Sequence, residues 1–206
     1  HSGDSACSLP PYSLSEELIK EVSIMVKSIA LEIKAVGLIN VQLAYHENTL
    51  FLLEVNPRAS RTIPFVSKCI GRSLAKVGAL CMAGISLKEQ NFLHEIIPPY
   101  FSVKEAVFPF TKFTGVDPIL GPEMKSTGEV MGTGLNFSEA YAKAQLGAGE
   151  KIPNSGSVFL SVRDSDRPFV GELAKEFHDL GFKIIATKGT ARSISERDIP
   201  VEVIKK

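Results

Sequence analysis

The chain has 206 residues, of which 44% are hydrophobic and 22% charged, and its 23 basic and 23 acidic side chains cancel to no formal net charge. This length suffices for one large or two small domains that bury a core. The neutral balance disfavours a nucleic-acid or membrane partner, and no apolar run reaches the roughly 18 residues of a membrane-spanning helix. The three cysteines, Cys7, Cys69 and Cys81, lack the pair spacing of a metal site, so we expect reduced thiols in a cytoplasmic protein.

The first long element is predicted to be an amphipathic helix. Apolar residues recur at steps of three and four along it, at Leu18, Val22, Met25, Ile29 and Ile33. Ser13 and Glu16 have the spacing of a capping box, which predicts the start of the helix, and Gly37 suits its C-terminal cap.

Two strand-like runs follow, at 38–45 and 49–55, and the polar residues between them predict a β-hairpin. Gln42 lies opposite Glu54 in this hairpin if the connecting loop has an odd number of residues. Because side chains alternate along a strand, Glu54 and Asn56 then share one face with Gln42.

Mixed secondary structure is predicted for the next hundred residues. Helical periodicity covers 65–86, with interruptions at Gly71 and Gly84. Residues 96–118 are rich in Pro and Phe and predict strands and long loops, and 127–149 predict a short strand and a helix.

The pattern changes near residue 150. EKIPNSG is typical of a linker, and strand–helix alternation beyond it predicts a parallel α/β unit, too small to complete a doubly wound sheet. We therefore predict an α+β domain with an antiparallel sheet at 1–150 and a partial parallel α/β domain at 151–206. The opening HSGDSACSLP, without an initiator methionine, indicates a piece of a longer protein.

A metal–nucleotide site is predicted at the end of the second hairpin strand. Gln42, Glu54 and Asn56 offer oxygen ligands with a single carboxylate, which suits Mg²⁺ completed by water and phosphate. Arg58 and Arg61 follow at once and could neutralise a transferring phosphoryl group through bidentate contacts. The alternative is a half-exposed ion pair between Glu54 and an arginine, with no ligand.

Three stretches resemble one family: HSGDSACSLP at 1–10, EVNPRASRTIPFVSKCIG at 54–71 and LGPEMKSTGEVMGTG at 120–134. They are similar to the large subunit of carbamoyl-phosphate synthetase, in the C-terminal half of its second ATP-grasp unit. The resemblance implies ATP- and Mg-dependent phosphorylation of carbamate to carbamoyl phosphate, for pyrimidine and arginine biosynthesis. The front half of that unit does not occur in the sequence, so we expect little or no turnover from this chain alone.

The resemblance also implies roles for single residues. Gln42, Glu54 and Asn56 match ligands of Mg²⁺ or Mn²⁺. Arg58 and Arg61 match the arginines that hold carbamate and the γ-phosphate. The ATP contacts that it implies are His1, Ser2, Gln42 and Glu54.

From about residue 155 the chain resembles the start of the family's allosteric domain, which is related to methylglyoxal synthase. There Thr187, Thr190 and Arg167 match positions that bind the phosphate of nucleotide effectors, such as uridine and inosine monophosphate. ATKGTARS follows a predicted strand and opens a helix, a turn that can cradle phosphate, although a threonine there more commonly caps the helix. Asp4 and Glu105 resemble carboxylates that hold the activator ornithine; ordinary solvated acids, with Glu105 paired to a lysine, are the alternative.

The partners implied by the resemblance are a glutaminase small subunit, the remaining parts of the large subunit, and small-molecule effectors, in a homo-oligomer of the full heterodimer. Two alternatives stay open from the residues themselves. One is another ATP-grasp carboxylate ligase, such as a biotin carboxylase or amino-acid ligase. The other is a non-catalytic fragment that binds nucleotide or metal.

Overall fold

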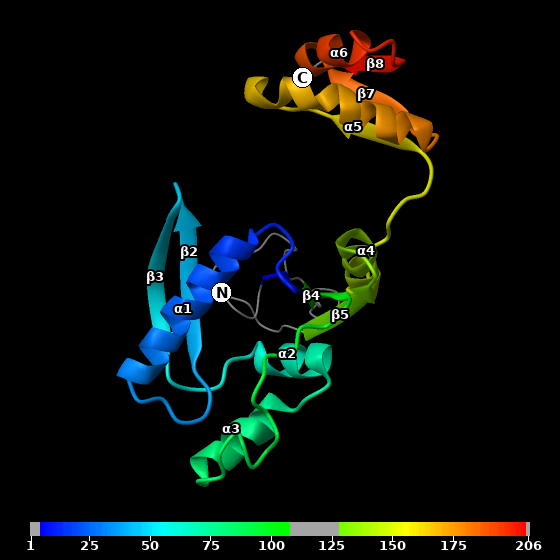
Figure 1. The fold of residues 1–206 in the computed structure, drawn as a ribbon. Helices are drawn as coiled ribbons and strands as arrows, with labels where there is room; N and C mark the ends of the chain where they lie inside the picture. The colour runs from blue at the N-terminus through cyan, green and yellow to red at the C-terminus, as the bar shows by residue number, and fades with distance from the viewer. Residues whose placement is uncertain (1–4, 108–127, 205–206) are drawn as a thin grey trace, which may run out of the picture. The chain divides into compact units, whose positions relative to one another are not determined.

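The computed structural model describes residues 5–107 and 128–204. The chain divides into two compact units, His1–Lys151 and Ile152–Lys206 (Figure 1). Within the described ranges, no helix combines the length and apolarity that crossing a bilayer requires.

The first unit contains a long helix, α1 (Glu16–Glu32), as predicted. Its N-cap is Ser15, whose side chain accepts a hydrogen bond at 3.2 Å from the backbone N–H three residues later. The predicted capping box at Ser13 is therefore wrong, because the cap lies two residues further on. Gly37 is not the C-terminal cap either, because the helix ends at Glu32 and its cap is Ile33.

The apolar face of α1 is partly buried. Leu18 is buried and Val22, Met25 and Ile29 are half-buried, whereas Ile33 just beyond the helix is 45% exposed. The opposite side of the helix also carries apolar residues, Ile24 and Leu31, which are 67% and 78% exposed.

Strands β2 (Asn40–His46) and β3 (Thr49–Asn56) form the predicted antiparallel hairpin (Figure 1). They are joined by a two-residue turn, Glu47 and Asn48, whose φ angles are 46° and 60°. Positive φ at both positions is the type I′ geometry, which matches the twist of the flanking strands.

A β-bulge sets the register of this hairpin. A two-residue turn alone would place Gln42 opposite Leu53. The register instead shifts after the pair Leu43–Leu52, so that Leu53 is the extra residue and Glu54 lies opposite Gln42. The predicted Gln42–Glu54 pairing is confirmed, but the predicted odd-numbered loop is wrong, since the bulge supplies the missing residue.

Two short helices follow the hairpin, α2 (Ile63–Ile70) and α3 (Leu74–Met82). Gly71 ends α2 in the left-handed conformation, with φ of 67°, and Gly84 follows α3 with φ of 90°. Both glycines interrupt the helical periodicity where the sequence predicts it, because the left-handed region is open to a residue without Cβ.

The remainder of the first unit is a three-stranded antiparallel sheet covered by a helix. Its strand order is β1–β4–β5, from β1 (Cys7–Leu9), β4 (Phe101–Val107) and β5 (Gly128–Gly134). Helix α4 (Phe137–Gly147) packs on β4 and β5. The approach is so close that a Cβ on Gly132 would lie 2.2 Å from the Ala140 carbonyl oxygen.

The second unit is the parallel α/β unit that the sequence predicts. Its elements in chain order are β6 (Ser157–Leu160), the 3₁₀ turn η2 (Asp164–Asp166), α5 (Arg167–Asp179), β7 (Lys183–Thr187), α6 (Lys188–Ser195) and β8 (Val201–Ile204). The strands pair in the order β6–β7–β8, all parallel.

This unit has a closed core of its own. Eight buried apolar residues form it: Leu160, Val170, Ala174, Ile184, Ala186, Ala191, Ile194 and Ile199. They come from β6, β7, both helices and the segment before β8, and they connect the strands to α5 and α6 through one core. The carboxyl edge of this sheet carries the predicted effector residues.

Candidate functional site

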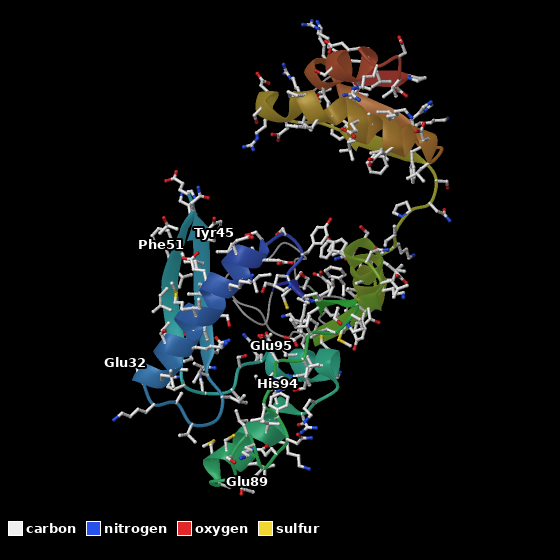
Figure 2. The ribbon with its side chains drawn as sticks, in the orientation of Figure 1. Glu32, Tyr45, Phe51, Glu89, His94 and Glu95 are labelled. Carbon is white, nitrogen blue, oxygen red and sulfur yellow. The ribbon has the colours of Figure 1, made fainter. Side chains whose placement is uncertain are left out.

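One face of the hairpin is apolar along its length, with the pairs Val41–Val55, Leu43–Leu52 and Tyr45–Leu50. The other, which we call the polar face, carries Ala44–Phe51 near the turn and the polar pairs Gln42–Glu54 and Asn40–Asn56 at the far end. Without the extra residue, β3 would present its apolar and polar side chains in the wrong alternation. Figure 2 labels Tyr45 and Phe51 near the turn end, where both are about half exposed.

The three predicted metal ligands lie together at the opposite end of the polar face. Gln42 and Glu54 are direct cross-strand partners. The Asn56 side-chain amide donates a hydrogen bond to Glu54 Oε1, so the amide oxygen of Asn56 remains available beside the carboxylate. One carboxylate and two amide oxygens are a donor set that fits Mg²⁺ or Mn²⁺.

This donor set differs from a metal site built by the protein alone. Across the residues described, no group of three or more His, Cys, Asp or Glu side chains gathers within reach of one ion. Glu54 is also exposed to solvent. A cation held by Gln42, Glu54 and Asn56 therefore needs further oxygen ligands from water, phosphate or more protein.

The predicted phosphate-binding arginines follow β3 in an exposed loop. The Arg58 backbone N–H donates to the Asn56 carbonyl at 2.8 Å, and its Nη1 donates to the Ala59 carbonyl at 3.1 Å. Among the described residues, no ion pair joins Arg58 or Arg61 to Glu54. His1 and Ser2 lie outside the described residues.

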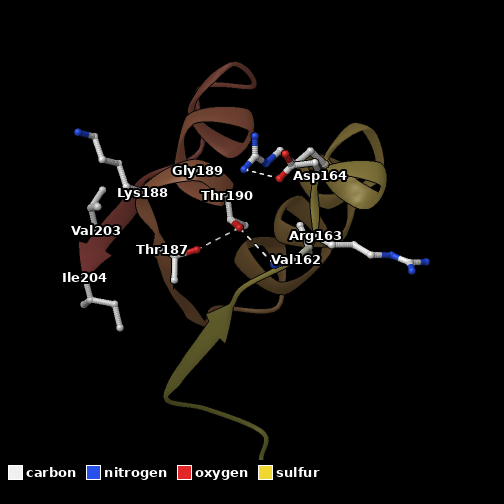
Figure 3. A pocket seen from close by; sticks show the side chains of 10 residues that line it. Val162, Arg163, Asp164, Thr187, Lys188, Gly189, Thr190, Val203 and Ile204 are labelled. Carbon is white, nitrogen blue, oxygen red and sulfur yellow. Dashed lines mark hydrogen bonds and ion pairs between the residues drawn. The ribbon is translucent and has the colours of Figure 1, made fainter. Parts of the chain in front are cut away.

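The effector residues of the second unit converge at one edge of its sheet (Figure 3). Thr187 Oγ1 donates to Thr190 Oγ1 at 3.3 Å, and the Val162 backbone N–H donates to the same oxygen at 3.2 Å. Ser161 Oγ lies 3.4 Å from Thr187 Oγ1. Since Thr190 accepts both bonds, its own hydroxyl proton is free to be donated to an anion.

Helix α6 begins at this cluster with its N-terminus uncapped by a side chain. Thr187 occupies the N-cap position but makes no side-chain cap hydrogen bond. Its hydroxyl instead serves the threonine cluster, so the capping alternative is wrong for Thr187. The first N–H groups of a helix favour an acceptor, and the helix dipole favours a negative one.

Arg167 supplies a cation at the same edge. Its Nη2 lies 2.7 Å from Asp164 Oδ1, and its guanidinium lies against Gly189, where a Cβ would approach Nη2 to 2.6 Å. A pocket of about 650 Å³ opens here, lined by Arg167, the two threonines and Gly189 among others. This volume is typical of a small-molecule site.

Of the two proposed ornithine carboxylates, Glu105 lies among the described residues. Glu105 accepts a hydrogen bond from Gln145 Nε2 at 2.9 Å. Its neighbour Lys104 is buried and forms an ion pair with Glu129. Asp4 lies outside the described residues.

Three residues of this edge are not among those predicted from the sequence: Ser161, Asp164 and Gly189. The sequence did carry a signal for Ser161. This residue lies at the end of the strand-like run before α5, as Thr187 ends the next run, and the carboxyl ends of parallel strands meet at one edge. Asp164 and Gly189 gave no such signal, because their roles depend on where Arg167 points.

The cysteines take no part in either site. Burial raises the pKa of Cys69, against hydrogen bonds that lower it, and burial likewise raises the pKa of Cys7, opposed by the nearby Lys104. Both thiols are therefore less ionised than an ordinary cysteine at neutral pH, and less nucleophilic. All three cysteines are free, as predicted.

Comparison with protein families gives two matches, one in each unit. Residues 1–90 match the family described as carbamoyl-phosphate synthase L chain, ATP binding domain, and residues 170–206 match the MGS-like domain. The chain is 61% identical over 206 residues to the carbamoyl phosphate synthase large chain of Pseudomonas aeruginosa, and 60% identical to that of Neisseria meningitidis serogroup A. The large chain of Ralstonia nicotianae is 56% identical over 210 residues. In each case the whole chain is covered, and it spans 19% of the relative's length.

Proposed function

We propose that this chain, which belongs to the carbamoyl phosphate synthase large chain family, supplies part of the carbamate-phosphorylating ATP site and a nucleotide-effector site of such an enzyme. The observation that carries the first role is the Gln42–Glu54 pair, with Asn56 bonded to the same carboxylate. The uncapped threonine cluster at the start of α6 carries the second.

In the first role, Gln42, Glu54 and Asn56 hold Mg²⁺ or Mn²⁺. The metal ions, when bound with ATP, offset the charge that develops on the transferred phosphoryl group. Arg58 and Arg61 bind carbamate and the γ-phosphate through charge-assisted hydrogen bonds, which orients the acceptor oxygen. His1 and Ser2 contact ATP.

The chain does not complete this site by itself. Its metal ligands lie on an exposed two-stranded hairpin, an element that is only marginally stable alone. Turnover therefore requires the remaining parts of a large chain. In this respect the chain behaves as a binding fragment, and the phosphorylation belongs to the assembly.

In the second role, Thr187, Thr190 and Arg167 bind the phosphate of a nucleoside monophosphate. The hydroxyl proton of Thr190, the N-terminus of α6 and the guanidinium all favour an anion at this edge. Ornithine at Asp4 and Glu105 stays a prediction.

The assembly that we propose is that of its relatives. It contains the remaining parts of the large chain and a glutaminase small subunit that supplies ammonia, in a homo-oligomer of that heterodimer. The location that we propose is the cytoplasm.

A segment exchange tests the catalytic role. The matching 19% of the Pseudomonas aeruginosa large chain is replaced by these 206 residues, and ATP formation from carbamoyl phosphate and ADP is measured. We expect activity within about tenfold of the parent, and a loss of at least about 100-fold for E54Q, which removes the charged ligand. E47Q is the matched control, because Glu47 lies at the turn of the same hairpin. Full activity of E54Q would overturn the metal assignment.

A further inference from the structure

We infer that Asp164 is an internal competitor for the anion at the effector site, and so sets the affinity of that site for nucleotide. The inference rests on the proposed effector function. Among the described residues, Arg167 is the one arginine whose guanidinium both lies against Gly189 and lines the pocket.

Asp164 pairs with one nitrogen of this guanidinium, Nη2, and does not bind the adjacent nitrogen, Nε. Asp164 Oδ1 lies 2.7 Å from Nη2, whereas Nε is buried and has no hydrogen-bond partner among the described residues. Nε and Nη2 form one edge of the guanidinium fork, and that edge binds phosphate through two parallel bonds. A phosphate that uses both arms therefore competes with Asp164 for the positive charge and the space at Nη2.

The surroundings of Arg167 favour such an exchange. The guanidinium lies over Gly189 in the first turn of α6, where the helix dipole is positive, so an anion is needed to offset two positive partners. Asp164 supplies this negative charge from the solvent-exposed side of the guanidinium, since its side chain is 86% exposed. A carboxylate held in water binds weakly enough to be displaced.

The neighbouring cations are not arranged in the same way. Arg163 donates from Nε to Asp166 Oδ2 at 3.1 Å, and Figure 3 shows Arg163 and Lys188 extending away from Thr190. Gly189 is also required for this arrangement, because any Cβ there would meet the Arg167 guanidinium. Asp164 and Arg167 therefore act as one unit, with Asp166 as a comparable acid outside it.

The test measures binding of uridine 5′-monophosphate, inosine 5′-monophosphate and inorganic phosphate to the full 206-residue chain by calorimetry at low salt. We expect D164N to tighten binding of the nucleotide that the wild type binds by about two- to fivefold, the range of an exposed ion pair. D166N is the matched control, because it removes the same charge from the same turn; its Kd should change by less than about 1.5-fold. The difference in Kd between D164N and the wild type should also shrink at 0.5 M salt, because salt screens the attraction between Asp164 and Arg167.

A double-variant cycle completes the experiment. R167Q alone should weaken binding, and D164N added to R167Q should give no further gain, because the competition needs the guanidinium. Unchanged or weaker binding in D164N, or an equal gain in the R167Q background, would overturn the inference while leaving the effector site intact. Absence of nucleotide binding by the wild-type chain would instead overturn the effector site itself, and the competitor with it.

Discussion

The two candidate sites of this chain differ in how much of their surroundings the chain itself supplies. The threonine cluster lies at the edge of a unit with eight buried core residues, beside a pocket of about 650 Å³. The metal-ligand face lies on a two-stranded hairpin whose Leu52 and Leu53 are 49% and 63% exposed. Both carry suitable chemistry, but only the first is supported by a core.

This difference shows that a chain can carry the ligand residues of a site without supplying the surrounding structure that makes the site work. Gln42 and Glu54 are paired by backbone hydrogen bonds and a bulge, which need no core. Holding them to a few tenths of an ångström against a substrate does need one. The large apolar exposure around the hairpin and α1 indicates where additional polypeptide would provide it.

The largest effect that we predict separates the two regions by stability. Ile194→Ala, at a position with no exposure, should lower the free energy of unfolding of the second unit by about 2–5 kcal/mol. Leu31→Ala, at a position 78% exposed on α1, should change stability by less than about 0.5 kcal/mol. Hydrogen exchange of peptides from each unit in urea measures both. A large loss for Leu31→Ala would show that α1 is already packed in this chain.

The second prediction concerns the three-stranded sheet of the first unit and the helix α4 that packs on it. Gly132→Ala should cost about 1–3 kcal/mol or more, because its Cβ would lie 2.2 Å from the Ala140 carbonyl oxygen and α4 would have to move. Gly149→Ala tests the other source of strain, since φ there is 92° but nothing lies near its Cβ. Thermal unfolding compares the two. Equal losses would mean that backbone strain, rather than the contact with α4, decides the cost.

A third prediction tests the threonine cluster. Thr190→Val should weaken binding of uridine 5′-monophosphate by about tenfold, because it removes a hydroxyl donor to a charged group. It also leaves the Val162 N–H without its acceptor, so stability must be followed in parallel. Thr190→Ser keeps the hydroxyl and should bind within about threefold of the wild type. Tenfold weaker binding in the serine variant would point to packing instead.

The last prediction concerns the reactivity of the cysteines. Cys69 is buried against β5, and burial raises its pKa, so its alkylation at pH 7.5 should be at least about tenfold slower than that of the more accessible Cys81. The raised pKa also has a consequence for stability. At alkaline pH the unfolded thiols lose their protons first, so the free energy of unfolding should fall as pH rises above the ordinary thiol range. Rapid alkylation of Cys69 would show that this part of the first unit opens readily.

Much of the fold could be predicted from the sequence because its signals are local. The hairpin, the glycine interruptions and the strand–helix alternation after residue 150 each follow from periodicity and turn residues within a short window. The pairing of Cys7–Leu9 with β4 could not be predicted, because a three-residue strand has no periodicity and its partner lies about a hundred residues away. The cap at Ser15 was missed since Ser13 offers the same chemistry.

The candidate site residues were likewise predictable only where the signal is local in the sequence. Glu54 and Asn56 share a face by simple alternation, and Gln42 joins them only because a bulge at Leu53 shifts the register. Thr187 and Thr190 lie three residues apart at a strand–helix junction, which sequence can indicate. The contact of Arg167 with both Asp164 and Gly189 depends on side-chain direction, which no spacing specifies.

One titration tests the central claim most directly. Backbone amide NMR spectra of the 206-residue chain are recorded with uridine 5′-monophosphate and, separately, with Mn²⁺. The account predicts saturable shifts at Thr187 and Thr190 with nucleotide, and only weak broadening near Glu54 that does not saturate below millimolar Mn²⁺. Tight, saturable metal binding at Glu54 without nucleotide binding at the threonines would contradict it, because the site without a core would then be the complete one.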